Sequence, residues 1–238
     1  MKEDGDLNAE LDYQKEELIR RYKAWGFLRI LRSKSVEKAF RILRRELFMP
    51  EGLRSHAYRS RAYFIAPGST ISAPYMQIIL AEALDLQVGQ KVLEIGSGSG
   101  YQAALCALIV APPESNWTGH VYTVETLPDV AEFARRNIES ANLQDKVTVI
   151  CGDGSVGLPD HAPFDRILVT ASAKKAPSSL LQQLKIGGSL VIPLGRFRRF
   201  QSLVRFTKIS ERKIKKRTIH HFSVYFVRLV GAEGWAED

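Results

Sequence analysis

The chain has little of what disulfide or metal chemistry requires. Only two of its 238 residues are cysteines, Cys106 and Cys151, and they lack the spacing of metal ligands. The five histidines show no metal-ligand pattern either. We therefore expect no metal site, and we expect the two thiols to pack as small apolar side chains in a reducing compartment, with no nucleophilic role.

Long hydrophobic runs are also missing. No run of about 18 or more apolar residues occurs, so the sequence offers no candidate transmembrane helix. The first six residues, MKEDGD, are acidic and polar, which is unlike a secretory signal. We therefore expect a cytoplasmic protein with no membrane contact.

Length and hydrophobic periodicity indicate the fold. A 45% apolar content is enough to bury a sizeable core, and 238 residues suit one α/β domain with an N-terminal addition. Helical periodicity over residues 10–23 and 35–46, with Ser35 as the expected cap of the second helix, predicts a helical cover. A third helix is expected over residues 72–85.

Beyond this helix, strand and helix patterns alternate, which predicts a parallel sheet covered on both faces. Residues 201–208 and 222–229 fit an antiparallel hairpin that finishes the sheet. The fold class we predict is a Rossmann-like, doubly wound α/β fold with a mostly parallel seven-stranded sheet. We expect an N-terminal cover and substrate-side segment at residues 1–71 and a cofactor-binding core with the hairpin at residues 72–238.

The most informative stretch is residues 91–100, KVLEIGSGSG, where a buried-strand pattern runs into three alternating glycines and then into an apolar helix. Glycines let the backbone approach a ligand, and the N-terminus of the next helix points free N–H groups at it. A dinucleotide fingerprint would need a small residue where Tyr101 stands. The segment therefore predicts a nucleotide-type cofactor and disfavours NAD.

Two further expected strands are followed closely by acidic residues. Glu125 closes the strand at residues 121–125, near the place, about 20 residues on, where an acid accepts hydrogen bonds from ribose hydroxyls. Asp153 follows the strand at residues 147–151 in a glycine turn, where it can accept from an exocyclic amine. Each acid alone could equally cap a helix or form a turn. All three landmarks in this order favour an adenosine-type cofactor.

Several segments resemble the protein-L-isoaspartate O-methyltransferase family, over roughly residues 35–235. The glycine loop and its neighbours would fit many enzymes that use S-adenosylmethionine, whereas the segment TISAP is far more specific. The segments that carry the resemblance are 48–51 (FMPE), 68–76 (GSTISAPYM), 93–104 (LEIGSGSGYQAA), 152–154 (GDG), 163–165 (PFD), 169–171 (VTA), 184–188 (LKIGG) and 226–235 (FVRLVGAEGW).

The resemblance implies a protein-L-isoaspartate(D-aspartate) O-methyltransferase. Such an enzyme transfers the methyl group of S-adenosylmethionine to the free α-carboxylate of L-isoaspartyl residues in damaged proteins, which starts their repair. A carboxylate is already ionised at neutral pH, so attack on the methyl group needs alignment and exclusion of water rather than a strong base. The lack of a Ser-His-Asp set is therefore no objection.

The resemblance also implies roles for individual residues. Ser72 matches the active-site serine, which would orient the substrate carboxylate or the cofactor, with Thr70 beside it. Ser72 equally fits the N-cap of the following helix, a role worth ~1 kcal/mol, and both roles can hold together. The cofactor-binding positions implied are Ser69, Gln77, Glu94, Gly96, Ser97, Gly98, Ser99, Gly100, Glu125, Thr126, Asp153 and Gly154.

The chain departs from the family pattern on the substrate side. Ser60 stands two positions after Tyr58, where the family usually has aspartate, Ala66 replaces a residue of a usual glycine-containing pair, and Arg228 stands where proline is usual. The cofactor assignment is unaffected. Because a carboxylate is lost and a guanidinium gained, the peptide specificity stays open.

Positive charge is concentrated in one segment. The net charge is +8, and residues 196–217 contain ten lysines and arginines against Glu211 alone. With the interleaved aromatics of residues 196–200 (RFRRF), this segment allows two alternative functions: an RNA methyltransferase, or a module that binds acidic partners or another subunit. It is equally compatible with a solvated hairpin tip that has no function of its own.

The segment after the expected fourth strand weighs against nucleic-acid methylation. Enzymes that methylate nucleic-acid amino groups carry an Asn-Pro-Pro-Tyr-like tetrapeptide there, whereas residues 169–172 read VTAS. The partners we expect are therefore isoaspartyl proteins and peptides, in a monomer or small homo-oligomer.

Overall fold

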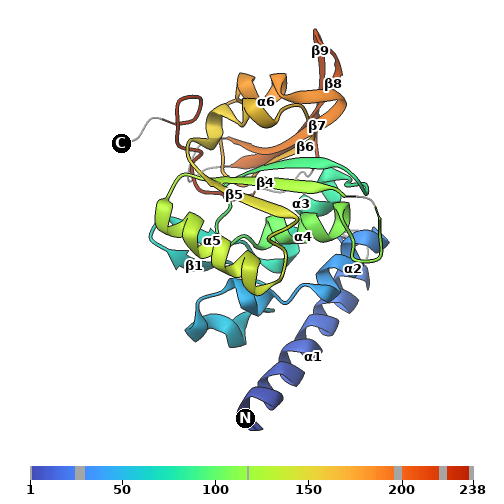
Figure 1. The fold of residues 1–238 in the computed structure, drawn as a ribbon, viewed down its shortest axis with the longest axis vertical. Coiled ribbons are helices and arrows are strands. Elements are labelled where there is room, and N and C mark those ends of the chain that lie inside the picture. Colours follow the sequence, from blue (N-terminus) through green and yellow to red (C-terminus); the bar gives the residue numbers. More distant parts are fainter. Residues whose placement is uncertain (1, 25–29, 117, 196–199, 220–223, 236–238) are drawn as a thin grey trace.

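The computed structural model describes residues 2–24, 30–116, 118–195, 200–219 and 224–235, with the backbone alone for residues 2–6. At its centre is a seven-stranded sheet in the order β5-β4-β3-β6-β7-β8-β9 (Figure 1). The first five strands of this order pair in parallel, and β8 and β9 are antiparallel. The strands are β3 (Lys91–Ile95), β4 (His120–Glu125), β5 (Val147–Cys151), β6 (Phe164–Val169), β7 (Leu184–Gly195), β8 (Gln201–Ser210) and β9 (Lys213–Thr218).

The position of each strand follows from its side chains. In β3, Val92, Leu93 and Ile95 are buried, as a central strand covered on both faces requires. In β9 every residue is exposed and most are basic, which suits an edge strand because like charges oppose pairing with another chain. From β3 the chain runs outward through β4 to β5, and it then crosses back to β6 on the other side of β3. This is the switch point beside which open α/β sheets bind ligands.

Helices cover both faces of the sheet. In Figure 1, α6 lies on one side and α3, α4 and α5 lie on the other. α4 is apolar except for Gln102, and all of its residues are buried, so it forms the centre of the core. The helices are α3 (Pro74–Leu84), α4 (Tyr101–Val110), α5 (Pro128–Ser140) and α6 (Ser178–Gln182), with the short turns η4 (Gly154–Val156) and η5 (Pro159–His161).

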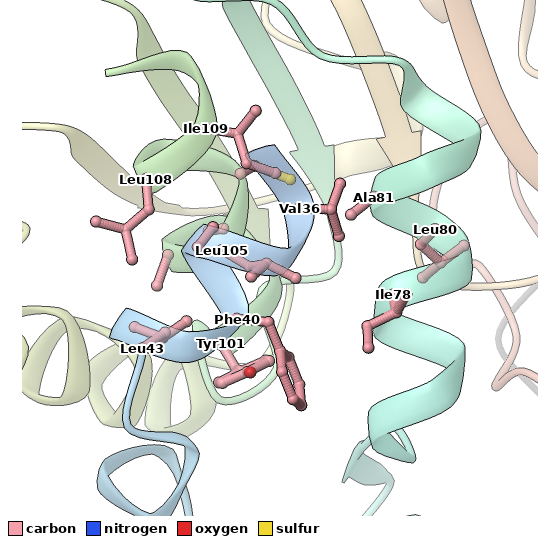
Figure 2. Packing of buried hydrophobic residues seen from close by; sticks show 14 of the residues in the cluster. Val36, Phe40, Leu43, Ile78, Leu80, Ala81, Tyr101, Leu105, Leu108 and Ile109 are labelled. Atoms are coloured by element: carbon pink, nitrogen blue, oxygen red, sulfur yellow. The ribbon is translucent and has the colours of Figure 1, made fainter. Parts of the chain in front are cut away.

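The N-terminal segment packs against this core. Val36 and Phe40 of α2 insert between the side chains of α3 and α4 (Figure 2). A small antiparallel sheet, β1–β2, then leads into α3. The division at residue 71 stays a prediction. The elements of this segment are α1 (Lys2–Ala24), α2 (Lys34–Ile42), η2 (Arg45–Phe48), η3 (Glu51–His56), β1 (Tyr63–Ala66) and β2 (Ser69–Ile71).

The structure confirms the predicted fold class and corrects one strand. The partner of β8 is Lys213–Thr218, and not residues 222–229, whose described part makes only isolated bridges. The alternation in that segment has another cause: Val224 and Phe226 are buried while Tyr225 is exposed, because the segment forms one wall of a cavity.

The expected cap of α2 is also wrong, by two residues. The N-cap position is Ser33, and its hydroxyl donates to the Glu82 carboxylate at 2.7 Å instead of capping the helix. Ser35 lies inside the helix. Among the described residues, no helix combines the length and the apolar character needed to span a bilayer.

Candidate active site

A cavity of about 1040 Å³ opens at the carboxyl ends of β3, β4 and β6. Its lining includes the glycine loop after β3 with the end of β4, a wall formed by β2 and the start of α3, and a wall formed by residues 224–230. Ligand cavities usually measure roughly 300–1,000 Å³. The cavity therefore has room for a nucleoside-sized cofactor and for part of a second molecule.

The glycine loop adopts a backbone that side chains would not tolerate. Gly96 has φ of +94°, and a Cβ there would lie 2.4 Å from Thr170 Oγ1. The Thr170 hydroxyl donates to the Gly96 carbonyl at 2.7 Å, so the loop is tied to the end of β6. Gly98 and Gly100 also have positive φ. The glycines are therefore required for this loop shape, as the sequence predicts.

Glu125 holds the loop from the other side. Its carboxylate accepts from the backbone N–H groups of Gly98 and Thr126, both at 2.9 Å, and of Leu127 at 3.2 Å. A carboxylate has about four acceptor positions, so one remains for a ligand hydroxyl. Because Glu125 lines the cavity, this geometry is compatible with the predicted ribose contact.

Glu94 and Gln102 are the cavity-lining residues that have a buried, unpartnered side-chain oxygen among the described residues, and Glu94 is the acidic one of the two. One carboxyl oxygen accepts from the Thr123 hydroxyl at 2.6 Å, while Oε1 is buried without a hydrogen-bond partner among the described residues. Burial raises the pKa of Glu94 to about 8, and the nearby charge of Glu125 acts in the same direction. A ligand that brings a cationic N–H group would therefore stabilise this carboxyl, which fits a cofactor with an ammonium group.

Ser72 lines the cavity between β2 and α3. Its predicted role as helix cap is wrong, since the N-cap of α3 is Ala73 and no side chain caps the helix. Instead, the Ser72 carbonyl accepts from Arg45 at 2.9 Å. The backbone of this candidate substrate-binding residue is thus fixed from behind, while its side chain is not used as a cap.

Arg45 is a supporting residue that sequence reasoning missed. Its guanidinium is fully buried and also donates to the Ala57 carbonyl, at 2.7 Å, and to the Gln77 side chain. Burial lowers the pKa of Arg45 to about 10, so it stays charged at neutral pH. No short sequence motif points to this role, because the contacts reach about 30 residues along the chain.

Asp153 does not line the cavity, although Gly154 beside it does. Its carboxylate accepts from the N–H groups of Ser155 and Ala232, both at 2.8 Å. Burial alone would raise its pKa, but these hydrogen bonds lower it. In this structure Asp153 anchors the C-terminal segment, and its predicted contact with adenine stays a prediction.

The other predicted site residues converge as expected. Apart from Asp153 and Gly100, which opens α4 just beyond the loop, every one of them lines the cavity. Gln201, which we did not predict, also lines it. The Gln201 amide accepts from the Phe226 N–H at 2.7 Å and donates to the Phe226 carbonyl at 3.2 Å, so it fixes the wall at residues 224–230.

Among the described residues, no group of three or more His, Cys, Asp or Glu side chains is placed to hold a metal ion.

The model of one protein family, described as "Protein-L-isoaspartate(D-aspartate) O-methyltransferase (PCMT)", matches residues 13–234. The chain belongs to this family.

Individual proteins named as protein-L-isoaspartate O-methyltransferases are also similar to this chain over most of its length. The enzyme of that name from Hyperthermus butylicus is 48% identical, over 92% of this chain and 90% of the relative. The one from Staphylothermus marinus is 47% identical, over 87% of this chain and 91% of the relative. A Plasmodium falciparum structure described as a protein-L-isoaspartate O-methyltransferase in complex with S-adenosyl-L-homocysteine has a TM-score of 0.77 at 26% identity, over 92% of this chain and 98% of the other.

These findings confirm the family, the enzyme class and the cofactor, S-adenosylmethionine, expected from the sequence. The roles of individual site residues stay predictions.

Proposed function

We propose that this chain methylates the free α-carboxylate of L-isoaspartyl residues in damaged proteins and peptides, using S-adenosylmethionine, and does so in the cytoplasm. The observation that carries the proposal is that the glycine loop and residues 69–73 line one cavity. The first segment is common to many methyltransferases, and the second carries the family-specific resemblance. The two segments therefore lie together in one cavity, as transfer of a methyl group from cofactor to peptide requires.

The cofactor end of the cavity is the glycine loop with Glu94 and Glu125. The loop lets the ligand approach the backbone, the free position of Glu125 accepts from a ribose hydroxyl, and the unpartnered oxygen of Glu94 accepts from the ammonium group. When bound, S-adenosylmethionine supplies a methyl group on a positively charged sulfur; a substrate carboxylate oxygen takes it as the carbon–sulfur bond breaks, which leaves a methyl ester and S-adenosylhomocysteine.

The substrate end holds Ser72 and Thr70. Their hydroxyls donate to the substrate carboxylate and orient it, with the Ser72 backbone fixed by Arg45. No proton has to move, because the carboxylate is ionised well above its pKa of about 3.5 to 4. The contribution of these residues is alignment and exclusion of water, which is worth most when the geometry is rigid.

The basic hairpin β8–β9 does not favour the alternative of RNA methylation. Among the described residues of the hairpin, Gln201 at its base lines the cavity and no lysine or arginine does. The exposed cations of β9, Lys213, Lys215, Lys216 and Arg217, instead suit a solvated edge strand.

The test is transfer of labelled methyl from S-adenosylmethionine to an isoaspartyl peptide, the matching aspartyl peptide and bulk RNA. We expect label on the isoaspartyl peptide alone, lost on base treatment as a methyl ester. A variant with Lys215, Lys216 and Arg217 changed to glutamine should keep this activity. Label on RNA without label on the isoaspartyl peptide would overturn the proposal.

A further inference from the structure

The strand β1 presents alternate residues to the cavity. Ala62, just before the strand, and Phe64 line the cavity, whereas Tyr63 and Ile65 do not. Tyr63 and Ile65 pack instead against the hydrophobic core. Because successive side chains of a strand point to opposite faces, the Phe64 side chain lies on the cavity face of β1.

Phe64 has the largest exposed fraction, 76%, of the large hydrophobic residues that line the cavity, among the described residues. The lining residues between positions 62 and 72 are all uncharged. Covering an aromatic ring with apolar atoms of a ligand removes its surface from water, which is favourable. The ring therefore offers an apolar contact surface to a molecule bound in the cavity.

Phe64 also lies directly beside the substrate end of the cavity. In the β1–β2 sheet it pairs with Thr70. Directly opposite residues have their side chains on the same face, with Cβ atoms about 4.5–5.5 Å apart. Thr70, which also lines the cavity, is one of the two residues that we propose to orient the reacting carboxylate. The separation is about that between neighbouring side chains of an extended peptide, so a residue next to the isoaspartate can reach the ring.

We propose that Phe64 is a specificity-determining residue that favours isoaspartyl residues with an apolar neighbour in the substrate sequence. This inference rests on the proposed function. The occupant of the exposed ring is the substrate peptide, because the ring shares one cavity with Thr70 and Ser72. The contact is remote from the reacting carboxylate, so it stabilises the bound substrate and the transition state equally. It therefore lowers KM and leaves kcat unchanged.

The experiment compares three isoaspartyl peptides: one with leucine immediately before the isoaspartyl residue, one with leucine immediately after it, and one with serine at both positions. Steady-state methylation is measured for the wild type, Phe64→Ser and Phe64→Leu. The matched control is Phe200→Ser, because Phe200 is 82% exposed and does not line the cavity.

For the wild type we expect kcat/KM to be about threefold to tenfold higher for at least one leucine peptide than for the serine peptide, through KM. Phe64→Ser should bring this ratio close to one. Phe64→Leu, which keeps an apolar side chain, should retain most of it, and Phe200→Ser should leave it unchanged.

Each other outcome has a distinct meaning. Equal kcat/KM on all three peptides in the wild type, or an unchanged ratio in Phe64→Ser, would overturn the role of Phe64 and leave the proposed function intact. An equal loss on all three peptides in Phe64→Ser would also overturn it, because it would show a structural defect. So would a dimer of the wild type that Phe64→Ser dissociates, measured by light scattering, since a second copy would then cover the ring. Failure of the wild type to methylate any isoaspartyl peptide would instead refute the proposed function.

Discussion

The buried guanidinium of Arg45 donates to the backbone carbonyl of Ser72 at 2.9 Å. All three hydrogen-bond acceptors of Arg45 are neutral, and its guanidinium also lies 5.2 Å from the centre of the Tyr101 ring. A buried cation held by neutral groups is costly to desolvate, and the hydrogen bonds of Arg45 fix the backbone of Ser72 beside the candidate active site.

Replacement of Arg45 should therefore affect both stability and activity. Arg45→Gln leaves the Ala57 and Ser72 carbonyls without their donor, and we expect a loss of about 3–5 kcal/mol in unfolding free energy. Arg45→Lys keeps the charge but cannot reach all three acceptors, so its unfolding free energy should lie between those of the wild type and Arg45→Gln. Denaturant unfolding measures the first effect. Methylation kinetics, at a temperature where both variants are folded, should show a higher KM for the peptide.

The raised pKa of Glu94 should make stability depend on pH. A carboxyl whose pKa is about 8 when folded, against about 4.3 when unfolded, favours the folded state below pH 4.3. This contribution is lost as the pH rises through 8. We expect the stability difference between the wild type and Glu94→Gln to fall over this interval, measured by urea unfolding at several pH values. A difference that rises with pH would contradict the assignment.

Cofactor binding should release a proton from the same carboxyl. Near pH 7 Glu94 is largely protonated in the free protein, and an ammonium group at its Oε1 would favour the ionised form. Calorimetric titration with S-adenosylhomocysteine in buffers of different ionisation enthalpy should therefore show release approaching one proton per site. The release should disappear in Glu94→Gln, and a heat independent of the buffer in the wild type would refute the contact.

Gly96, which lines the cavity, and Gly152, which does not, offer a matched comparison. In Gly96→Ala the new Cβ meets the Thr170 hydroxyl in a backbone with positive φ, so we expect a loss of about 1–3 kcal/mol together with weaker cofactor binding. Around Gly152 a Cβ would meet nothing within 4 Å. Gly152→Ala should therefore stay within about 0.5 kcal/mol of the wild type. Thermal unfolding with and without S-adenosylhomocysteine distinguishes the two, and equal effects would contradict the role of the loop.

The affinity for the cofactor should depend on the charge of Glu125. Glu125→Gln keeps the shape of the side chain but removes one of the two acceptor oxygens that now serve Gly98 and Thr126. We expect affinity for S-adenosylhomocysteine to fall by about tenfold or more, since hydrogen bonds to a charged group are worth ~1.5–3 kcal/mol. Glu132→Gln, on the exposed face of α5, is the control. An unchanged dissociation constant in Glu125→Gln would exclude the predicted contact.

The parts of the site that could be predicted from sequence are those carried by short local patterns. A strand followed by glycines places Gly96 and Gly98 at the end of β3, and an acid at the end of the next strand places Glu125 beside them. Contacts between distant segments have no such pattern. The hydrogen bond from Arg45 to Ser72 and the anchoring of Ala232 by Asp153 depend on how the chain folds back on itself.

The second strand of the C-terminal hairpin could not be located from the sequence, which predicts it at residues 222–229 instead of Lys213–Thr218. β9 is a strand because β8 offers it a free edge, and its solvated side chains carry no apolar alternation that could reveal this. The alternation at residues 222–229 was real, but Val224 and Phe226 are buried as the wall of a cavity and form no continuous strand. Burial pattern alone does not distinguish these two environments.

The most direct test of the account is to locate the transferred methyl group by tandem mass spectrometry, after incubation of the chain with S-adenosylmethionine and an isoaspartyl peptide. We expect the methyl on the free α-carboxylate of the isoaspartyl residue, and none on the matching aspartyl peptide. A methyl group on the peptide terminus, on another side chain, or equally on both peptides would contradict the account.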